Sequence, residues 1–148
     1  MVSRKFYIFM FVFLGFTVIL DLVLSTTCLV FPDTWFMTFH GVHYDSLDMY
    51  ALLKRTGAVW VAFTLLQLIA MFRWTKAPYW LVLIAGVRLT ELFSDWTYMY
   101  LAHTMTPIGK IGLFIAPPGN LVFGIFLIWA YKKIMRCGGP PVVVEARK

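Results

Sequence analysis

The sequence predicts an all-α fold: a polytopic membrane protein built as a four-transmembrane-helix bundle with a short outer amphipathic helix. Three observations predict it. The chain is 61% apolar and 14% charged, whereas soluble proteins are typically about 45–50% apolar and about 25% charged. Four apolar stretches are long enough, or nearly long enough, to cross a bilayer as helices, and basic residues cluster beside their ends. The 148 residues leave no room for a second folded unit, so we expect a single domain.

The four spans are predicted at residues 6–31, 56–74, 78–102 and 120–134. Each is expected to be helical because backbone polar groups in lipid must find their partners within the segment. A helix rises about 1.5 Å per residue, so about 20 residues cross the hydrocarbon. The fourth stretch is the shortest, and an alternative start for it lies near Ile111, ahead of Pro117 and Pro118.

Two further segments lie outside these spans. In the long loop between the first two spans, residues 44–55 carry Leu47, Tyr50 and Ala51 at the spacing of one helix face. We expect a short amphipathic helix there, which lies flat on the outer membrane surface or caps the bundle. Residues 138–148 begin with Gly-Gly-Pro-Pro, which breaks a helix, and are expected to form a flexible cytoplasmic tail.

The basic residues that flank the spans predict the orientation. With four spans both termini lie on one side, which then carries nine of the flanking basic residues: Arg4, Lys5, Arg73, Lys76, Lys132, Lys133, Arg136, Arg147 and Lys148. The other side carries Lys54, Arg55 and Lys110. The positive-inside rule therefore predicts an integral, multi-pass membrane protein with both termini in the cytoplasm. Because basic residues beside the spans account for the net charge of +6, we expect no nucleic-acid partner.

The third span contains an unusual set of ionisable residues. Arg88, Glu91 and Asp95 fall within about 60° of one another on a helix, and Tyr98 continues the same stripe. A charged side chain near the centre of a membrane helix costs roughly 2.5–3.5 kcal/mol on insertion scales, so the rest of the protein must shelter it. This stripe is the first candidate for a functional site.

Polar residues on the other spans reach similar depths. On the first span Thr17, Asp21, Ser25 and Cys28 also share one face, and Asp21 is the only charge among them. The second span contributes Gln67 near mid-membrane. We therefore predict one buried polar centre that opens toward the outer side. Its candidate residues are Asp21, Arg55, Trp60, Gln67, Arg88, Glu91, Asp95 and Tyr98.

Three interpretations of this centre stay open. The charges nearly balance, with one carboxyl in excess, so Arg88, Glu91 and Asp21 can form a satisfied network that only locks the bundle. The same groups can instead line a pocket for a ligand, with Arg88 or a protonated carboxyl on its polar head. A proton or ion pathway through the excess carboxyl is the third interpretation.

Signals for metal binding and catalysis are weak. His40, His43 and His103 lie in the outer loops near Asp45 and Asp48, and H-x-x-H is a usable ligand spacing. Histidines beside interfacial aromatic residues are more often membrane anchors, so no metal site is assigned. The chain contains no G-x-S-x-G, H-E-x-x-H or P-loop motif. We assign no catalytic residue, the sequence requires no cofactor, and a non-enzymatic role is favoured.

The function favoured at this point is that of a small integral membrane subunit or accessory protein, packed within a larger membrane complex. The reason is that the predicted bundle exposes many aromatic and aliphatic side chains and has little mass outside the membrane. The alternative is binding of a lipid-like amphiphile, such as a quinone, sterol or lipid, at the polar centre, with proton-coupled transport or lipid-modifying chemistry as variants. The expected partners are membrane lipids and either a protein partner or further copies of the chain.

Overall fold

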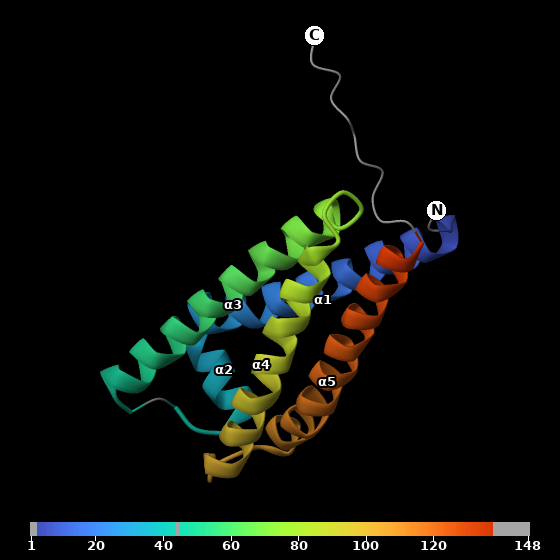
Figure 1. The fold of residues 1–148 in the computed structure, drawn as a ribbon. Coiled ribbons are helices and arrows are strands. Elements are labelled where there is room, and N and C mark those ends of the chain that lie inside the picture. The colour runs from blue at the N-terminus through green and yellow to red at the C-terminus, as the bar shows by residue number, and fades with distance from the viewer. Residues whose placement is uncertain (1–2, 44, 138–148) are drawn as a thin grey trace.

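The structure is a computed structural model that describes residues 3–43 and 45–137. Over these residues it contains five helices and no strand: α1 (Arg4–Val30), α2 (Pro32–Phe39), α3 (Leu47–Arg73), α4 (Tyr79–Leu101) and α5 (Pro107–Arg136) (Figure 1). The predicted all-α fold is therefore confirmed. The tail predicted for residues 138–148 lies outside the described residues.

Three of the described helices are long and apolar enough to span a membrane, judged by length and composition: α1, α3 and α5. The predicted span 78–102 corresponds to α4, which has 23 residues and carries Arg88, Glu91 and Asp95. Three helices are thus compatible with the predicted membrane protein, and α4 differs from them in carrying three ionisable residues close together in its middle.

The expectation of a separate amphipathic helix at residues 44–55 is wrong. The segment from Leu47 onward is instead the first part of α3, which continues unbroken to Arg73. The Ser46 side chain caps the helix by accepting a hydrogen bond of 3.1 Å from the Met49 N–H. Gly57 does not end the helix, because it lies against α1, where an added Cβ would come within 2.8 Å of Cys28 Cβ.

Helix α2, which follows α1 almost at once, was not predicted from the sequence. Phe31 precedes Pro32 and is not helical, with φ −124° and ψ 56°, because a residue before proline avoids the α conformation. Pro32 then occupies the first turn of α2, where its missing N–H costs nothing. Trp35 and Phe36 are buried, and α2 packs against α1, α3 and α5.

Helix α5 is longer than the predicted span 120–134. It begins at Pro107, after Thr106, whose side chain accepts a hydrogen bond of 3.0 Å from the Gly109 N–H. Pro117 and Pro118 lie inside it and remove two backbone donors, yet the helix continues. Its packing against α4 gives a physical reason why the prolines do not end it.

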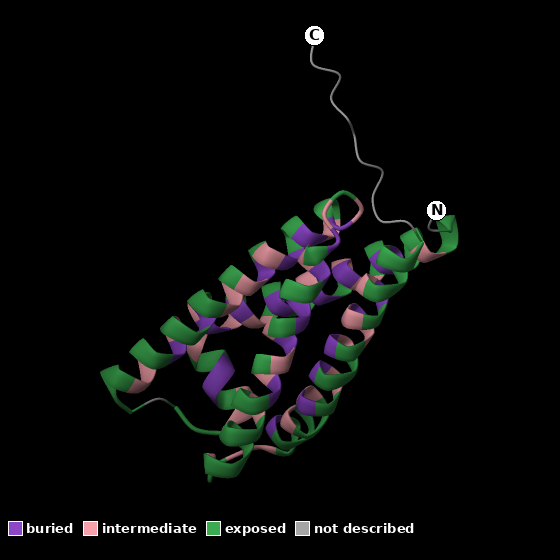
Figure 2. Ribbon diagram, in the orientation of Figure 1, coloured by how far each residue is buried: buried purple, intermediate pink, exposed green. Residues whose placement is uncertain are grey.

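The four long helices form two close pairs, α1 with α3 and α4 with α5. The start of α1 and the end of α5 lie at one end of the bundle, and α2 lies toward the other end (Figure 1). Gly124 permits the close approach of α4 to α5, since a Cβ there would come within 2.8 Å of Leu89 Cγ. Buried residues line the inward faces, and exposed residues cover the outward faces (Figure 2). Many of those exposed residues are large and apolar, as expected in lipid.

Candidate functional site: a buried polar centre between the helix pairs

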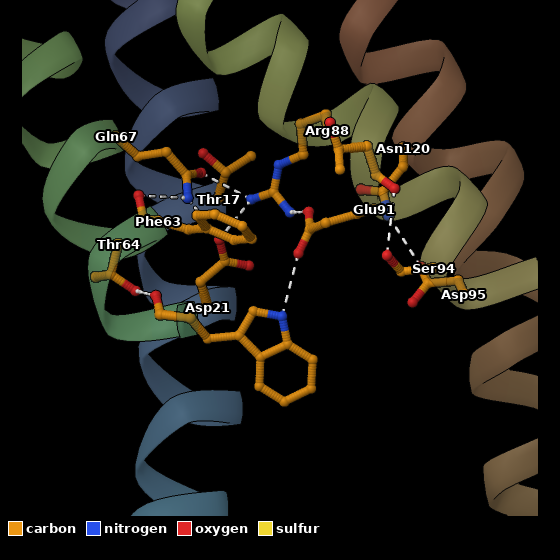
Figure 3. Close-up of polar contacts among 12 residues, drawn as sticks. Thr17, Asp21, Phe63, Thr64, Gln67, Arg88, Glu91, Ser94, Asp95 and Asn120 are labelled. Atoms are coloured by element: carbon orange, nitrogen blue, oxygen red, sulfur yellow. Dashed lines mark hydrogen bonds and ion pairs between the residues drawn. The ribbon is translucent and has the colours of Figure 1, made fainter. Parts of the chain in front are cut away.

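Arg88 on α4 reaches across to the α1/α3 pair (Figure 3). One terminal nitrogen, Nη2, donates to Asp21 Oδ2 at 2.9 Å and to Gln67 Oε1 at 2.7 Å. The other, Nη1, donates to Glu91 Oε2 at 2.8 Å, one turn along α4. The Arg88 residue is only 3% exposed. A single guanidinium group therefore joins three helices in the interior of the bundle.

Gln67 on α3 completes this arrangement. Its Nε2 donates to Asp21 Oδ2 at 2.5 Å and to the Phe63 carbonyl at 3.1 Å. Its Oε1 accepts from Arg88. Gln67 and Asp21 are 0% and 1% exposed. A buried amide that uses both its donor and its acceptor ends orients the carboxylate and the guanidinium at the same time.

Aromatic side chains cover this centre on the side that faces α2. Trp60 on α3 donates from Nε1 to Glu91 Oε1 at 3.2 Å. The Trp35 ring of α2 lies 5.4 Å from the Trp60 ring and 4.4 Å from the Phe39 ring, measured between centroids. Trp60 was predicted as part of the polar centre, and its indole N–H bonds to the Glu91 carboxylate. We define the polar centre as Asp21, Trp60, Gln67, Arg88 and Glu91.

Asp95 belongs to a separate contact. Its Oδ2 accepts a hydrogen bond of 3.1 Å from Nδ2 of Asn120 on α5 (Figure 3). Asp95 is partly buried, and this bond ties α4 to α5 within their pair. Asn120 was not predicted as a partner of Asp95, although a polar residue at the start of the predicted fourth span was a signal for it. The predicted stripe on α4 thus faces two different neighbours.

Tyr98, the last residue of that stripe, is bonded to His40 rather than to the polar centre. His40 Nδ1 lies 2.7 Å from the Thr104 carbonyl. Since a carbonyl only accepts, Nδ1 carries a proton, and in the neutral ring Nε2 accepts from the Tyr98 hydroxyl. This contact joins the end of α2 to the end of α4 and to the loop that follows it.

Arg55 is exposed, and no ion pair within residues 3–43 and 45–137 connects it to the polar centre.

The histidines named as weak metal candidates do not form a cluster of ligands. His43 Nδ1 lies 3.9 Å from Asp33 Oδ1, while His103 is exposed. Over the described part of the chain, no group of three or more His, Cys, Asp or Glu side chains is placed to hold a metal ion.

Two shallow hollows, each of about 420 Å³, lie on outward faces of the bundle. One is lined by Phe93, Ser94, Thr97, Tyr98 and Leu101 of α4. The other is lined by residues of α3 near Phe72. Neither hollow is lined by a residue of the polar centre.

A comparison with protein-family models, curated proteins and solved structures finds no match for this chain. The polar centre therefore has to be interpreted from its own chemistry. It holds one guanidinium, two carboxylates, one amide and one indole N–H, and most of their hydrogen-bonding capacity is used within the protein. Among the described buried side chains, Arg88 Nε and Trp74 Nε1 are the nitrogens that lack a hydrogen-bond partner.

Proposed function

We propose that the chain is an integral membrane protein in which α4 spans the bilayer together with α1, α3 and α5, and both termini face the cytoplasm. The 23 residues of α4 extend over about 35 Å, enough to cross the hydrocarbon. Arg88 is directed to protein partners, and outward residues such as Val82, Leu83 and Phe93 are apolar and exposed. Sheltered charges of this kind are compatible with a membrane span.

Cysteine labelling tests this topology. Cys137 is exposed at the end of α5, and Lys110 is exposed near its start. We expect a membrane-impermeant maleimide to reach Cys137 only from the cytoplasmic face. In a Cys137→Ser background, a Lys110→Cys variant should react only from the outer face, since α5 separates the two positions. Labelling of both positions from the same face contradicts the four-span model.

Within this model, we propose that the protein is a small structural or accessory subunit of a membrane complex rather than an enzyme. The observation that carries this proposal is the polar centre, where Asp21, Gln67 and Glu91 all bond to the buried Arg88 guanidinium. Polar groups that form hydrogen bonds with one another hold helices in register and leave few free donors or acceptors for a substrate.

The outward faces support a partner within the membrane. Large exposed apolar residues occur on every long helix, for example Phe16, Phe72, Phe93 and Phe114, and the connections between α3, α4 and α5 are short. Such a protein presents its surface to lipid and to neighbouring helices rather than to the aqueous phase.

Photo-crosslinking tests the subunit proposal. Benzoylphenylalanine placed in turn at Phe16, Phe72, Phe93 and Phe114 samples one outward face on each long helix with little change in shape. We expect at least one position to yield a discrete polypeptide adduct. The position on the opposite face of the bundle should yield no polypeptide adduct. The captured polypeptide should also co-purify at a fixed ratio in mild detergent. An adduct with the mass of two chains identifies a homo-oligomer, and absence of any polypeptide adduct at all four positions contradicts the proposal.

Binding of a lipid-like amphiphile such as a quinone or sterol at the polar centre is the second candidate. The observation in its favour is Arg88 Nε, which is buried and has no hydrogen-bond partner within the described residues. A polar headgroup bonded there would be lost on Arg88→Gln substitution. Mass spectrometry of lipids that co-purify with the native protein and with this variant separates the candidates, because a structural centre predicts the same lipids in both.

A further inference from the structure

Lys133 lies beside two aromatic rings at the end of the bundle where α1 begins and α5 ends (Figure 1). Its Nζ is 4.7 Å from the centroid of the Phe6 ring and 4.8 Å from that of Trp129. Both distances are within the range of cation–π attraction. The two rings therefore position the ammonium group beside the place where side chains of α1 and α5 are in contact.

An aromatic strip extends from this position along α1 and α5. Trp129 lies 6.0 Å from Phe6 and 5.7 Å from Phe126, and Phe126 lies 5.5 Å from Phe9, all measured between ring centroids. Trp129 and Phe9 are 49% and 54% exposed. We call Phe6, Phe9, Phe126 and Trp129 the α1/α5 seam. It presents a continuous apolar surface that leads away from the ammonium group into the span.

The surroundings of Lys133 are strongly basic. The ends of α1, α3 and α5 and the loop after α3 together carry seven basic residues at this end of the bundle: Arg4, Lys5, Arg73, Lys76, Lys132, Lys133 and Arg136. No acidic residue occurs in the described segments 3–20, 70–90 or 96–137. Within the described residues, none of these seven cations takes part in an ion pair. The Lys133 ammonium is thus oriented by rings, and no carboxylate of residues 3–43 or 45–137 pairs with it.

We propose that the α1/α5 seam binds an anionic phospholipid of the cytoplasmic leaflet, with its phosphodiester on Lys133 and an acyl chain along Phe126 and Phe9. The proposal rests on the membrane embedding proposed above. An oriented cation at the interface attracts a phosphate, and neighbouring cations add to the potential. The apolar α1/α5 seam next to Lys133 can pack against a hydrocarbon chain, and a soluble phosphate has no such chain. A cation beside an apolar surface therefore favours a lipid as the ligand.

Native mass spectrometry of the purified full-length protein tests the site. The protein is mixed in detergent with phosphatidylglycerol and phosphatidylcholine that carry the same acyl chains. We expect Lys133→Gln to lower retention of phosphatidylglycerol about fivefold, the change expected for one basic side chain at an anionic surface. Retention of phosphatidylcholine should not change. Lys133→Arg should retain phosphatidylglycerol to within about twofold, because it preserves the charge.

Lys110→Gln is the matched control, since it removes the same charge from the other end of the same helix. We expect it to leave retention of both lipids unchanged. Equal losses in the two Gln variants, no loss in Lys133→Gln, or a loss in Lys133→Arg as large as in Lys133→Gln overturns the proposal. Displacement of phosphatidylglycerol by equimolar inorganic phosphate also overturns it, because the site then recognises a free anion. Labelling and crosslinking outcomes do not depend on this lipid, so the two proposals fail separately.

Discussion

Replacement of Arg88 by leucine is expected to lower the free energy of unfolding by about 3–5 kcal/mol. The change removes the only described cation of the polar centre and leaves the carboxylates of Asp21 and Glu91 without it. Asp21 is 1% exposed, so water cannot replace the lost partner. Thermal melting of the purified protein in detergent measures the loss.

Two comparisons make this expectation specific. Arg55→Leu is the same substitution at an exposed position of α3 and should change stability by no more than about 0.5 kcal/mol. Adding Asp21→Leu to Arg88→Leu removes one of the two uncompensated carboxylates, so the double variant should recover part of the loss. Strict additivity of these two changes, or an Arg55→Leu loss as large as that of Arg88→Leu, contradicts the role assigned to the centre.

Replacement of Gly109 by alanine is expected to destabilise the protein by about 1–3 kcal/mol. Gly109 lies in the first turn of α5, where an added Cβ would come within 2.3 Å of the Phe39 carbonyl oxygen at the end of α2. This oxygen also accepts from the Thr106 N–H at 3.0 Å. The larger residue forces the two helix ends apart and breaks the contact between them. Unfolding in a denaturing detergent titration measures the loss.

Gly119→Ala provides the control for this change. Gly119 lies on the same helix, but an added Cβ there meets nothing within 4 Å. We therefore expect the Gly119→Ala protein to be as stable as the native protein or slightly more stable, because alanine loses less backbone freedom on folding than glycine does. Hydrogen exchange at residues 32–40 should increase in Gly109→Ala alone. Equal stability of the two variants contradicts the close α2–α5 contact.

The sequence predicted the grouping of the polar residues in part. Arg88, Glu91, Asp21 and Gln67 were grouped from helical periodicity and depth alone, and the structure brings them together. Asp95 was grouped with them because it shares their helix face, yet it bonds to Asn120. A face of about 60° is wide enough to touch two neighbouring helices, and periodicity does not say which neighbour lies where.

The helical composition and the apolar character of α1, α3 and α5 were determined by the sequence itself, because they depend on local features. Length of an apolar run, spacing of side chains and the effect of a proline on the preceding residue are all readable from a short segment. The end of α1 before Phe31-Pro32 is of this kind, although α2 beyond it was overlooked.

The tertiary structure alone decided the pairing of the helices, the position of α2 and the partners of the polar groups. The continuation of α3 through Gly57 and of α5 through Pro117 goes against local propensity. Gly57 of α3 lies against Cys28 of α1, and Asn120, just after the prolines of α5, is hydrogen-bonded to Asp95 of α4. Such packing, and hydrogen bonds such as that from Trp60 to Glu91, join residues far apart in the chain. Their energies depend on distances that no local pattern encodes.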